Sequence, residues 1–135
     1  MVIEGRVLIE GAGTGPLLRL SAPLSFWGGV DPKTGMISDP RHPQHGKSIA
    51  GTVPALAEPR GSSSSSAIML ELIARRLAPS ALLLGEADAI LTLGIVVARE
   101  MGHPTLPALE VAPADLLRLP ERRLKVSGGT ISEAE

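Results

Sequence analysis

Residues 60–84, RGSSSSSAIMLELIARRLAPSALLL, contain the pattern of a helix followed closely by that of a strand. The apolar residues between Ile68 and Ile73 fall on one side at helical spacing. Ala81–Leu84 is short and wholly apolar, which is typical of a strand buried on both faces. The serine run at 62–66 precedes the helical pattern. We therefore expect it at the helix N-terminus, where hydroxyl groups cap free N–H groups.

The chain after this stretch continues to alternate between helix and strand. Ala87–Met101 predicts a second helix, and because it carries little charge before Arg99 we expect it to be largely buried. Gly102-His103-Pro104 is expected to end it. The remaining expected elements are a strand at 109–111, a brief helix at 113–119 and a closing hairpin of strands 124–126 and 130–132, with fraying over residues 131–135.

The chain before this stretch is rich in strands and long loops. Val2–Glu10, Leu17–Leu20 and residues 48–56 are expected to form strands. Gly11–Pro16 lacks the G-x-G-x-x-G spacing of a dinucleotide loop and leads into a strand, so a hairpin or wide turn is favoured. Turn-forming residues from 28 to 46 predict a long loop. This distribution predicts an α/β fold of β/β/α layers, not a doubly wound sheet.

Composition limits the possible functions. The 135 residues correspond to one domain, residues 1–135. With a net charge of −1, one Trp, one Phe and no Tyr, we expect an aliphatic core and no nucleic-acid or membrane-surface binding. No stretch reaches the roughly 18 apolar residues of a membrane span, and no secretory signal is recognised, so a cytoplasmic location is expected. Without cysteine, the chain has no thiolates for an iron–sulfur cluster or a structural zinc.

The Arg60-Gly61-Ser62 segment is the most favourable place for chemistry. A glycine lets the backbone approach a ligand closely. The helix N-terminus offers free N–H groups and a positive dipole end to an anion, and the Arg60 guanidinium suits a carboxylate or phosphate. The same groups would stabilise a serine alkoxide. Composition leaves open the alternative of a polar helix cap that follows a flexible linker.

Two other kinds of site find less support in the sequence. A serine hydrolase needs a nucleophile elbow, and Gly-x-Ser-x-Gly is absent. Asp31, Asp39, His42 and His45 are residue types found in metal sites, but their spacing matches no defined ligand set. Turn-capping aspartates and solvated histidines are the favoured interpretation, and no metal ligand is assigned to this chain.

Six segments, in this order, resemble the small-domain family of aconitase X. They are 25–35 (SFWGGVDPKTG), 39–43 (DPRHP), 46–51 (GKSIAG), 60–66 (RGSSSSS), 78–81 (APSA) and 88–100 (DAILTLGIVVARE). The combination of G-G-V-D-P-x-T-G with G-S-S-S-S-S is highly specific. The resemblance covers roughly residues 3–111.

This resemblance implies the swivelling β/β/α fold of the aconitase small domain. It implies an active site at the junction with a Cys-containing large subunit or domain, which holds an iron or iron–sulfur centre that helps to expel hydroxide. The small domain supplies a serine whose alkoxide removes a proton next to a carbonyl-bearing carbon. That base corresponds to Ser62, with Ser63 as the alternative register, and Arg60, Gly61 and Ser63 would bind substrate.

Two branches of the family share these motifs. One resembles cis-3-hydroxy-L-proline dehydratase, which gives Δ1-pyrroline-2-carboxylate. The other resembles phosphomevalonate dehydratase, which converts mevalonate 5-phosphate to anhydromevalonate phosphate. Residues 88–100 are more similar to the hydroxyproline branch, so we expect a small hydroxy-acid substrate of that kind and activity only with the large subunit. A hypothesis of another class is a non-catalytic module that binds an anionic metabolite at the same helix end.

Overall fold

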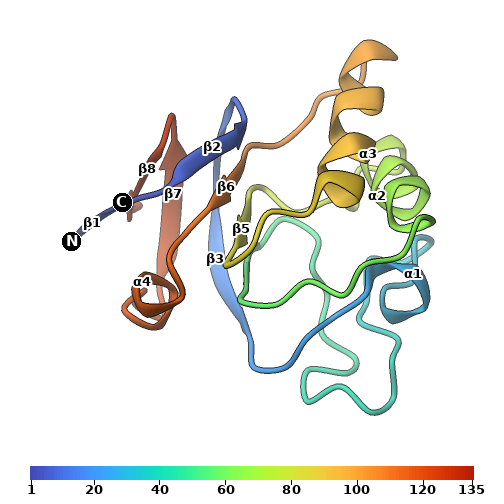
Figure 1. Ribbon diagram of the computed structural model, residues 1–135, viewed down its shortest axis with the longest axis horizontal. Helices are drawn as coiled ribbons and strands as arrows, with labels where there is room; N and C mark the ends of the chain where they lie inside the picture. The colour runs from blue at the N-terminus through green and yellow to red at the C-terminus, as the bar shows by residue number, and fades with distance from the viewer.

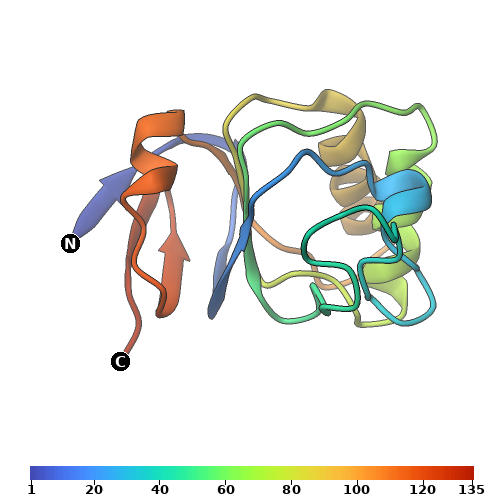
Figure 2. The same cartoon turned by 90° about the horizontal axis from the view of Figure 1, so that it is seen from below.

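The computed structural model describes residues 1–135 and has three layers. A small antiparallel layer with one helix lies on one side of the central strands, and three helices lie on the other side (Figures 1 and 2). The elements are β1 (Val2–Glu4), β2 (Arg6–Ile9), β3 (Ala12–Leu20), α1 (Phe26–Gly29), β4 (Val53–Leu56), α2 (Ser65–Ala74), β5 (Leu82–Leu84), α3 (Ala89–Glu100), β6 (Ala108–Glu110), α4 (Pro113–Leu117), β7 (Arg123–Ser127) and β8 (Thr130–Glu133).

One long strand, β3, belongs to both β layers. The strand order is β1-β8-β7-β3-β4-β5-β6-β2. Residues 12–16 of β3 pair antiparallel with β7, whereas residues 17–20 pair parallel with β4. The parallel set continues through β5 and β6, and β2 closes that edge antiparallel to β6. This arrangement confirms the predicted β/β/α layering.

Two aliphatic cores separate the layers. Strand β5 shows the division, because Leu82 and Leu84 belong to the core beneath α2 and α3, whereas Leu83 faces the core beneath α4 and the β7–β8 hairpin. Successive side chains of a strand point to opposite faces, so a continuous apolar run fits a strand that is covered on both sides. The buried residues include one aromatic side chain, Phe26. The expectation of an aliphatic core is therefore confirmed.

From Ala12 onward the glycine-rich run lies inside β3, and only Gly11 lies in the connection from β2, so the expected hairpin or wide turn at Gly11–Pro16 is wrong. A Cβ at Gly13 would lie 1.9 Å from the carbonyl oxygen of Ser80, and a Cβ at Gly15 would lie 2.2 Å from that of Gly51. Two loops distant in sequence therefore pass directly over the strand. These glycines are needed for close packing, not for turning the chain or for binding phosphate.

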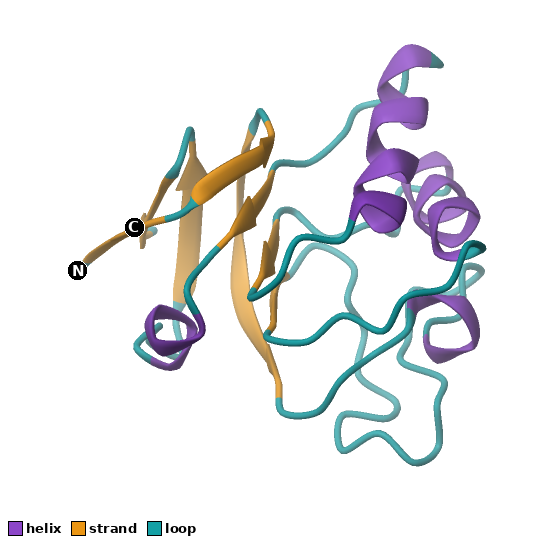
Figure 3. Cartoon of the chain, viewed as in Figure 1, coloured by secondary structure: helices purple, strands orange, loops and turns teal.

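Two further expectations need correction. Residues 131–133 do not fray, because they pair with β1 and β7 and Ile131 is completely buried. The helix predicted at 87–101 is α3. The expectation that it is largely buried is wrong, because one of its sides is exposed. The long loop expected at 28–46 does lie between α1 and β4 (Figure 3). Every helix is too short or too polar to cross a membrane.

Replacing Gly13 with alanine should destabilise the fold, because the new Cβ would collide with the backbone of Ser80. We expect Gly13→Ala to lower the free energy of unfolding by about 3 kcal/mol, as for overpacked cores. Urea denaturation, monitored by circular dichroism, measures this change in the free energy of unfolding. Gly61→Ala is the matched control, since its Cβ would meet nothing within 4 Å. Equal stability of both variants would contradict the close approach.

Candidate functional site

The serine run is fixed at the start of α2 by contacts with the segment before α1. Leu24 and Pro59 form an isolated parallel bridge, and the N–H of Arg60 donates to the carbonyl of Leu24 at 3.1 Å. Beyond this anchor, Gly61 is exposed. The chain then turns, with the N–H of Ser65 donating to the carbonyl of Ser62 at 3.0 Å. The expected position of the serines at a helix N-terminus is therefore confirmed.

The backbone at this helix start carries free hydrogen-bond donors. The N–H groups of Ser62 and Ser63 have no acceptor within the chain. The side chain of Ser64, at the N-cap position, makes no capping hydrogen bond. Unpaired N–H groups at a helix N-terminus carry partial positive charge and attract anions. The N–H of Ser66, which a side-chain cap at Ser64 would have accepted, also has no acceptor, so it adds to the free N–H groups of Ser62 and Ser63.

The serine hydroxyl groups lie in different surroundings. The Oγ atom of Ser62 accepts a hydrogen bond from the N–H of Ser64 at 3.3 Å, and the residue is half-buried. Ser63 is exposed, and its carbonyl accepts from the Ser66 hydroxyl at 3.4 Å. Ser65 is fully buried, and its Oγ has no partner. An N–H donor aimed at a hydroxyl oxygen favours negative charge on that oxygen, so Ser62 is the serine best suited to become an alkoxide.

Arg60 supplies a free cation beside these donors. Its side chain is exposed and forms no hydrogen bond or ion pair within the chain. Arg75, at the far end of α2, is instead paired with Glu71 at 2.9 Å. A guanidinium presents a planar fork of donors that matches a carboxylate or a phosphate. Arg60 and the helix start together form a site suited to an anionic ligand.

The aspartates of the 28–46 loop stabilise turns. Oδ1 of Asp31 accepts from the N–H of Lys33 at 2.9 Å, and Oδ1 of Asp39 accepts from the N–H of Arg41 at the same distance. The Arg41 backbone N–H, aided by its guanidinium, holds the pKa of Asp39 below its ordinary value. Both residues are therefore turn caps, as the sequence indicated.

His42 is a structural residue. It is buried, so the expectation that it is solvated is wrong. Its Nδ1 accepts from the N–H of Gln44 at 3.0 Å, which leaves Nε2 to donate to the carbonyl of Ala22 at 3.1 Å. Neither nitrogen has a lone pair free for a metal. His45 is exposed, as expected, and no group of three or more His, Asp or Glu side chains is placed to hold a metal ion.

Comparison with known proteins identifies the family. The model of the Aconitase X swivel domain matches residues 2–131. This chain belongs to the aconitase X swivel-domain family. A crystal structure of Thermococcus kodakaraensis aconitase X in its holo-form superposes with a TM-score of 0.87 at 29% identity, covering 100% of this chain and 99% of that one. The swivel fold is thereby confirmed.

The relatives of this swivel domain carry two different names. It is 38% identical over 133 residues, 98% of its length, to a cis-3-hydroxy-L-proline dehydratase of Hypocrea jecorina. It is 36% identical over 126 residues, 93% of its length, to a phosphomevalonate dehydratase small subunit of Methanothermobacter thermautotrophicus. The chain spans only 22% of the first protein but 92% of the second. The comparisons leave the substrate branch open.

The swivel domain has a cleft near its candidate site that the sequence analysis missed. It measures about 400 Å³ and is lined by Trp27 together with Ser25, Gly28, Gly29, Asp39, Pro40 and Arg41. Trp27 is 57% exposed although it is the only tryptophan of the chain. It follows Leu24, which holds Arg60, by three residues. The sequence feature that could have indicated this cleft is the lone tryptophan in a chain almost free of aromatic residues.

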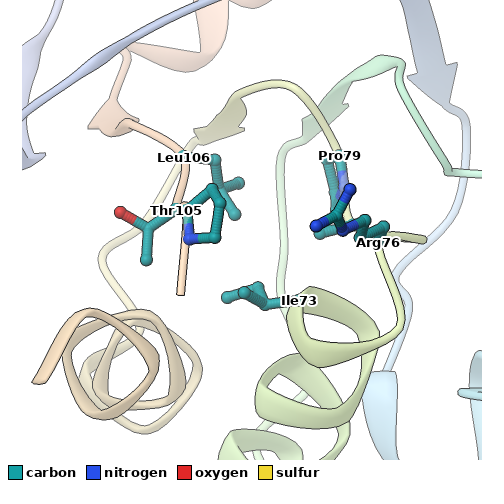
Figure 4. Close-up of a pocket in the computed structure, with 7 residues that line it drawn as sticks. Ile73, Arg76, Pro79, Thr105 and Leu106 are labelled. Atoms are coloured by element: carbon teal, nitrogen blue, oxygen red, sulfur yellow. The ribbon is translucent and has the colours of Figure 1, made fainter. Parts of the chain in front are cut away.

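A second hollow, of about 270 Å³, lies at the opposite end of α2 (Figure 4). Arg76 stands at its edge, and Ile73, Pro79, Thr105 and Leu106 line it. Arg76 has a φ of 60° and follows the last turn of α2, where glycine is usual. Because α2 is ten residues long, this hollow is about 15 Å from the serine run and is not part of the candidate site.

Removing the Ser65 hydroxyl should not harm the domain, because that hydroxyl is buried without a partner. We expect Ser65→Ala to leave the free energy of unfolding unchanged or to raise it by about 1 kcal/mol. Thr52→Val is the control, since its hydroxyl donates to Ile49 at 2.8 Å and its loss should cost about 1 kcal/mol. Thermal unfolding measures the stability of both variants. If Ser65→Ala loses as much stability as Thr52→Val, the Ser65 hydroxyl makes a hydrogen bond.

Proposed function

We propose that this chain is the small, swivel-domain part of an aconitase X-type dehydratase, and that Ser62 is its general base. One observation carries the proposal. The Ser62 Oγ accepts the Ser64 N–H at the start of α2, beside free backbone donors and the unpaired Arg60. This arrangement stabilises an alkoxide and attracts an anionic substrate in the same place.

The reaction is a β-elimination of water from a hydroxy acid. Ser62, as its alkoxide, takes the proton from the carbon next to the carbonyl group. The electron pair of that C–H bond forms the new double bond, and the bond to the hydroxyl group on the neighbouring carbon breaks. The hydroxide leaves with its electron pair and, with the proton that Ser62 has taken, makes up the water released, which regenerates the alkoxide. With 3-hydroxyproline the C=C product is an enamine, which tautomerises to the Δ1 imine. Arg60 and the N–H groups of Ser62 and Ser63 hold the carboxylate or phosphate of the substrate.

The chain does not itself fit an iron or iron–sulfur centre. It contains no cysteine, and none of its His, Asp and Glu side chains gather in a group of three or more. We assign no step to a metal within this chain. The centre that family resemblance implies is proposed to lie on a larger, Cys-containing partner, which would also exclude water from the Ser62 site.

We propose cis-3-hydroxy-L-proline as the substrate and Δ1-pyrroline-2-carboxylate as the product. The support is the similarity of residues 88–100 to that branch and the 38% and 39% identity to the cis-3-hydroxy-L-proline dehydratases of Hypocrea jecorina and Pseudomonas aeruginosa. Mevalonate 5-phosphate is the alternative, supported by the 36% identity to a phosphomevalonate dehydratase small subunit. Turnover of each compound by the complete enzyme decides between them.

The role of Ser62 can be tested in the complete two-part enzyme. A general base contributes about 10²- to 10⁴-fold to rate, so Ser62→Ala should lower kcat by about 1,000-fold with substrate binding retained. Ser63→Ala is the matched control, because its hydroxyl is exposed and receives no N–H. It should retain kcat within about threefold.

Each other outcome of this test has a definite meaning. Loss of turnover in Ser63→Ala, with Ser62→Ala active, would move the base by one residue. Full activity in both variants would exclude a serine base here. Anion binding without catalysis would then be the better account, since a binding module needs the amides and Arg60 but not the Ser62 hydroxyl.

Arg60 should affect substrate affinity more than the chemical step. We expect Arg60→Ala to raise KM by about 100-fold and Arg60→Lys by about tenfold, because lysine keeps the charge but not the two-pronged geometry. Arg75→Ala, at the other end of α2, is the control and should leave KM unchanged. Steady-state kinetics of the complete enzyme measure these values, and an unchanged KM in Arg60→Ala would remove Arg60 from the site.

A further inference from the structure

Helix α3 carries a stripe of exposed apolar side chains. Its inner side consists of the buried residues Leu91, Gly94, Ile95 and Ala98. Its outer side exposes Ile90 (38%), Leu93 (50%), Val96 (43%) and Val97 (37%), and the exposed Met101 (61%) directly follows the helix. No charged residue occurs between Asp88 and Arg99, and the exposed Glu100 then follows Val96 and Val97 on the same side at helical spacing. We call these five exposed residues the α3 stripe.

The stripe borders a shallow groove between α2 and α3. The groove measures about 230 Å³ and is lined by Ser66, Ala67 and Leu70 of α2 and by Leu93, Gly94 and Val97 of α3. The helices are in tight contact there, because a Cβ at Gly94 would lie 2.5 Å from the carbonyl oxygen of Ser66. The two helices lie side by side in Figures 1 and 2. The close contact between the two helix backbones therefore forms the bottom of the groove.

The α3 stripe differs from the other exposed apolar residues. The other large ones are Met1, Val2, Trp27, Met36 and Leu117, which are distributed over separate parts of the chain. Single exposed apolar residues are ordinary, whereas a contiguous patch marks a surface that another body covers. Ile90, Leu93, Val96 and Val97 form a patch of this kind, which ends at the exposed, charged Glu100 on the same side of the helix.

We propose that the α3 stripe and its groove are the surface on which the larger part of the dehydratase docks, and that this larger part presents an apolar surface to them. This proposal rests on the proposed function, because it takes the partner to be the one that completes the Ser62 site. This domain corresponds to only 22% and 23% of the length of the two hydroxyproline dehydratase relatives. Such an enzyme therefore has a much larger part that is available to contact the swivel domain.

Continuity with the serine run favours this partner over a second copy of the chain. Ser66 lines the groove, and its hydroxyl donates to the carbonyl of Ser63, next to Ser62. A protein that binds in the groove therefore contacts the start of α2. Apolar contact there would shield the helix end and Arg60 from water, which strengthens their interaction with an anion. The Ser62 site and the groove are adjacent parts of one surface.

Binding of the separately purified larger part, measured by isothermal titration calorimetry, tests the proposal. We expect the double variant Leu93→Asp, Val97→Asp to raise Kd by at least about 100-fold, and Leu93→Ala to raise it by about tenfold. Leu117→Asp is the matched control, because Leu117 is 78% exposed on α4 in the opposite layer. It should change Kd by less than about twofold. Leu93→Ala keeps the test valid if the double variant does not fold.

The outcomes separate this proposal from the assignment of Ser62. Ser62→Ala should bind the larger part normally, so weak binding by the stripe variants supports the docking surface even if Ser62 proves not to be the base. Unchanged binding by Leu93→Ala and the folded double variant would overturn the proposal. A dimer of this chain alone that Leu93→Ala dissociates would also overturn it, because the stripe would then be a self-association surface.

Discussion

The structure depends on a single strand, β3, that serves two layers at once. Its first half pairs with β7 and its second half with β4, so the antiparallel layer and the parallel layer are joined through one backbone. Two loops cross this strand so closely that only glycine fits at positions 13 and 15. The parallel layer then carries the chain through β4 toward Arg60 and the start of α2. The position of the candidate site follows from this packing.

The candidate site combines three weak effects at one point. A helix N-terminus, an unpaired guanidinium and a hydroxyl that accepts an N–H each favour negative charge by a modest amount in water. Their effect grows when solvent is excluded, because electrostatic interactions strengthen in a low dielectric. The chain alone leaves Arg60 and Ser63 exposed. The exposed α3 stripe beside them is consistent with a site that is completed only when a second body covers it.

The sequence predicted the elements with strong local patterns. The α2 and α3 helices, the apolar strand at 82–84 and the β7–β8 hairpin were found in this way, as was the serine run at a helix start. Gly13 and His42 were misinterpreted because their partners, Ser80 and Ala22, are distant in sequence. The outer side of α3 was misjudged for another reason: apolar periodicity does not say whether the covering surface belongs to the same molecule. The free N–H groups and the unpaired Arg60 depend on side-chain placement, which only the structure provides.

A crystal structure of the complete enzyme with a competitive substrate analogue tests the central claim most directly. The account predicts that the Ser62 Oγ lies about 3–3.5 Å from the carbon that loses its proton, with the carboxylate or phosphate on Arg60 and the free N–H groups of the helix start. An analogue bound elsewhere, with the serine run facing solvent, would contradict it.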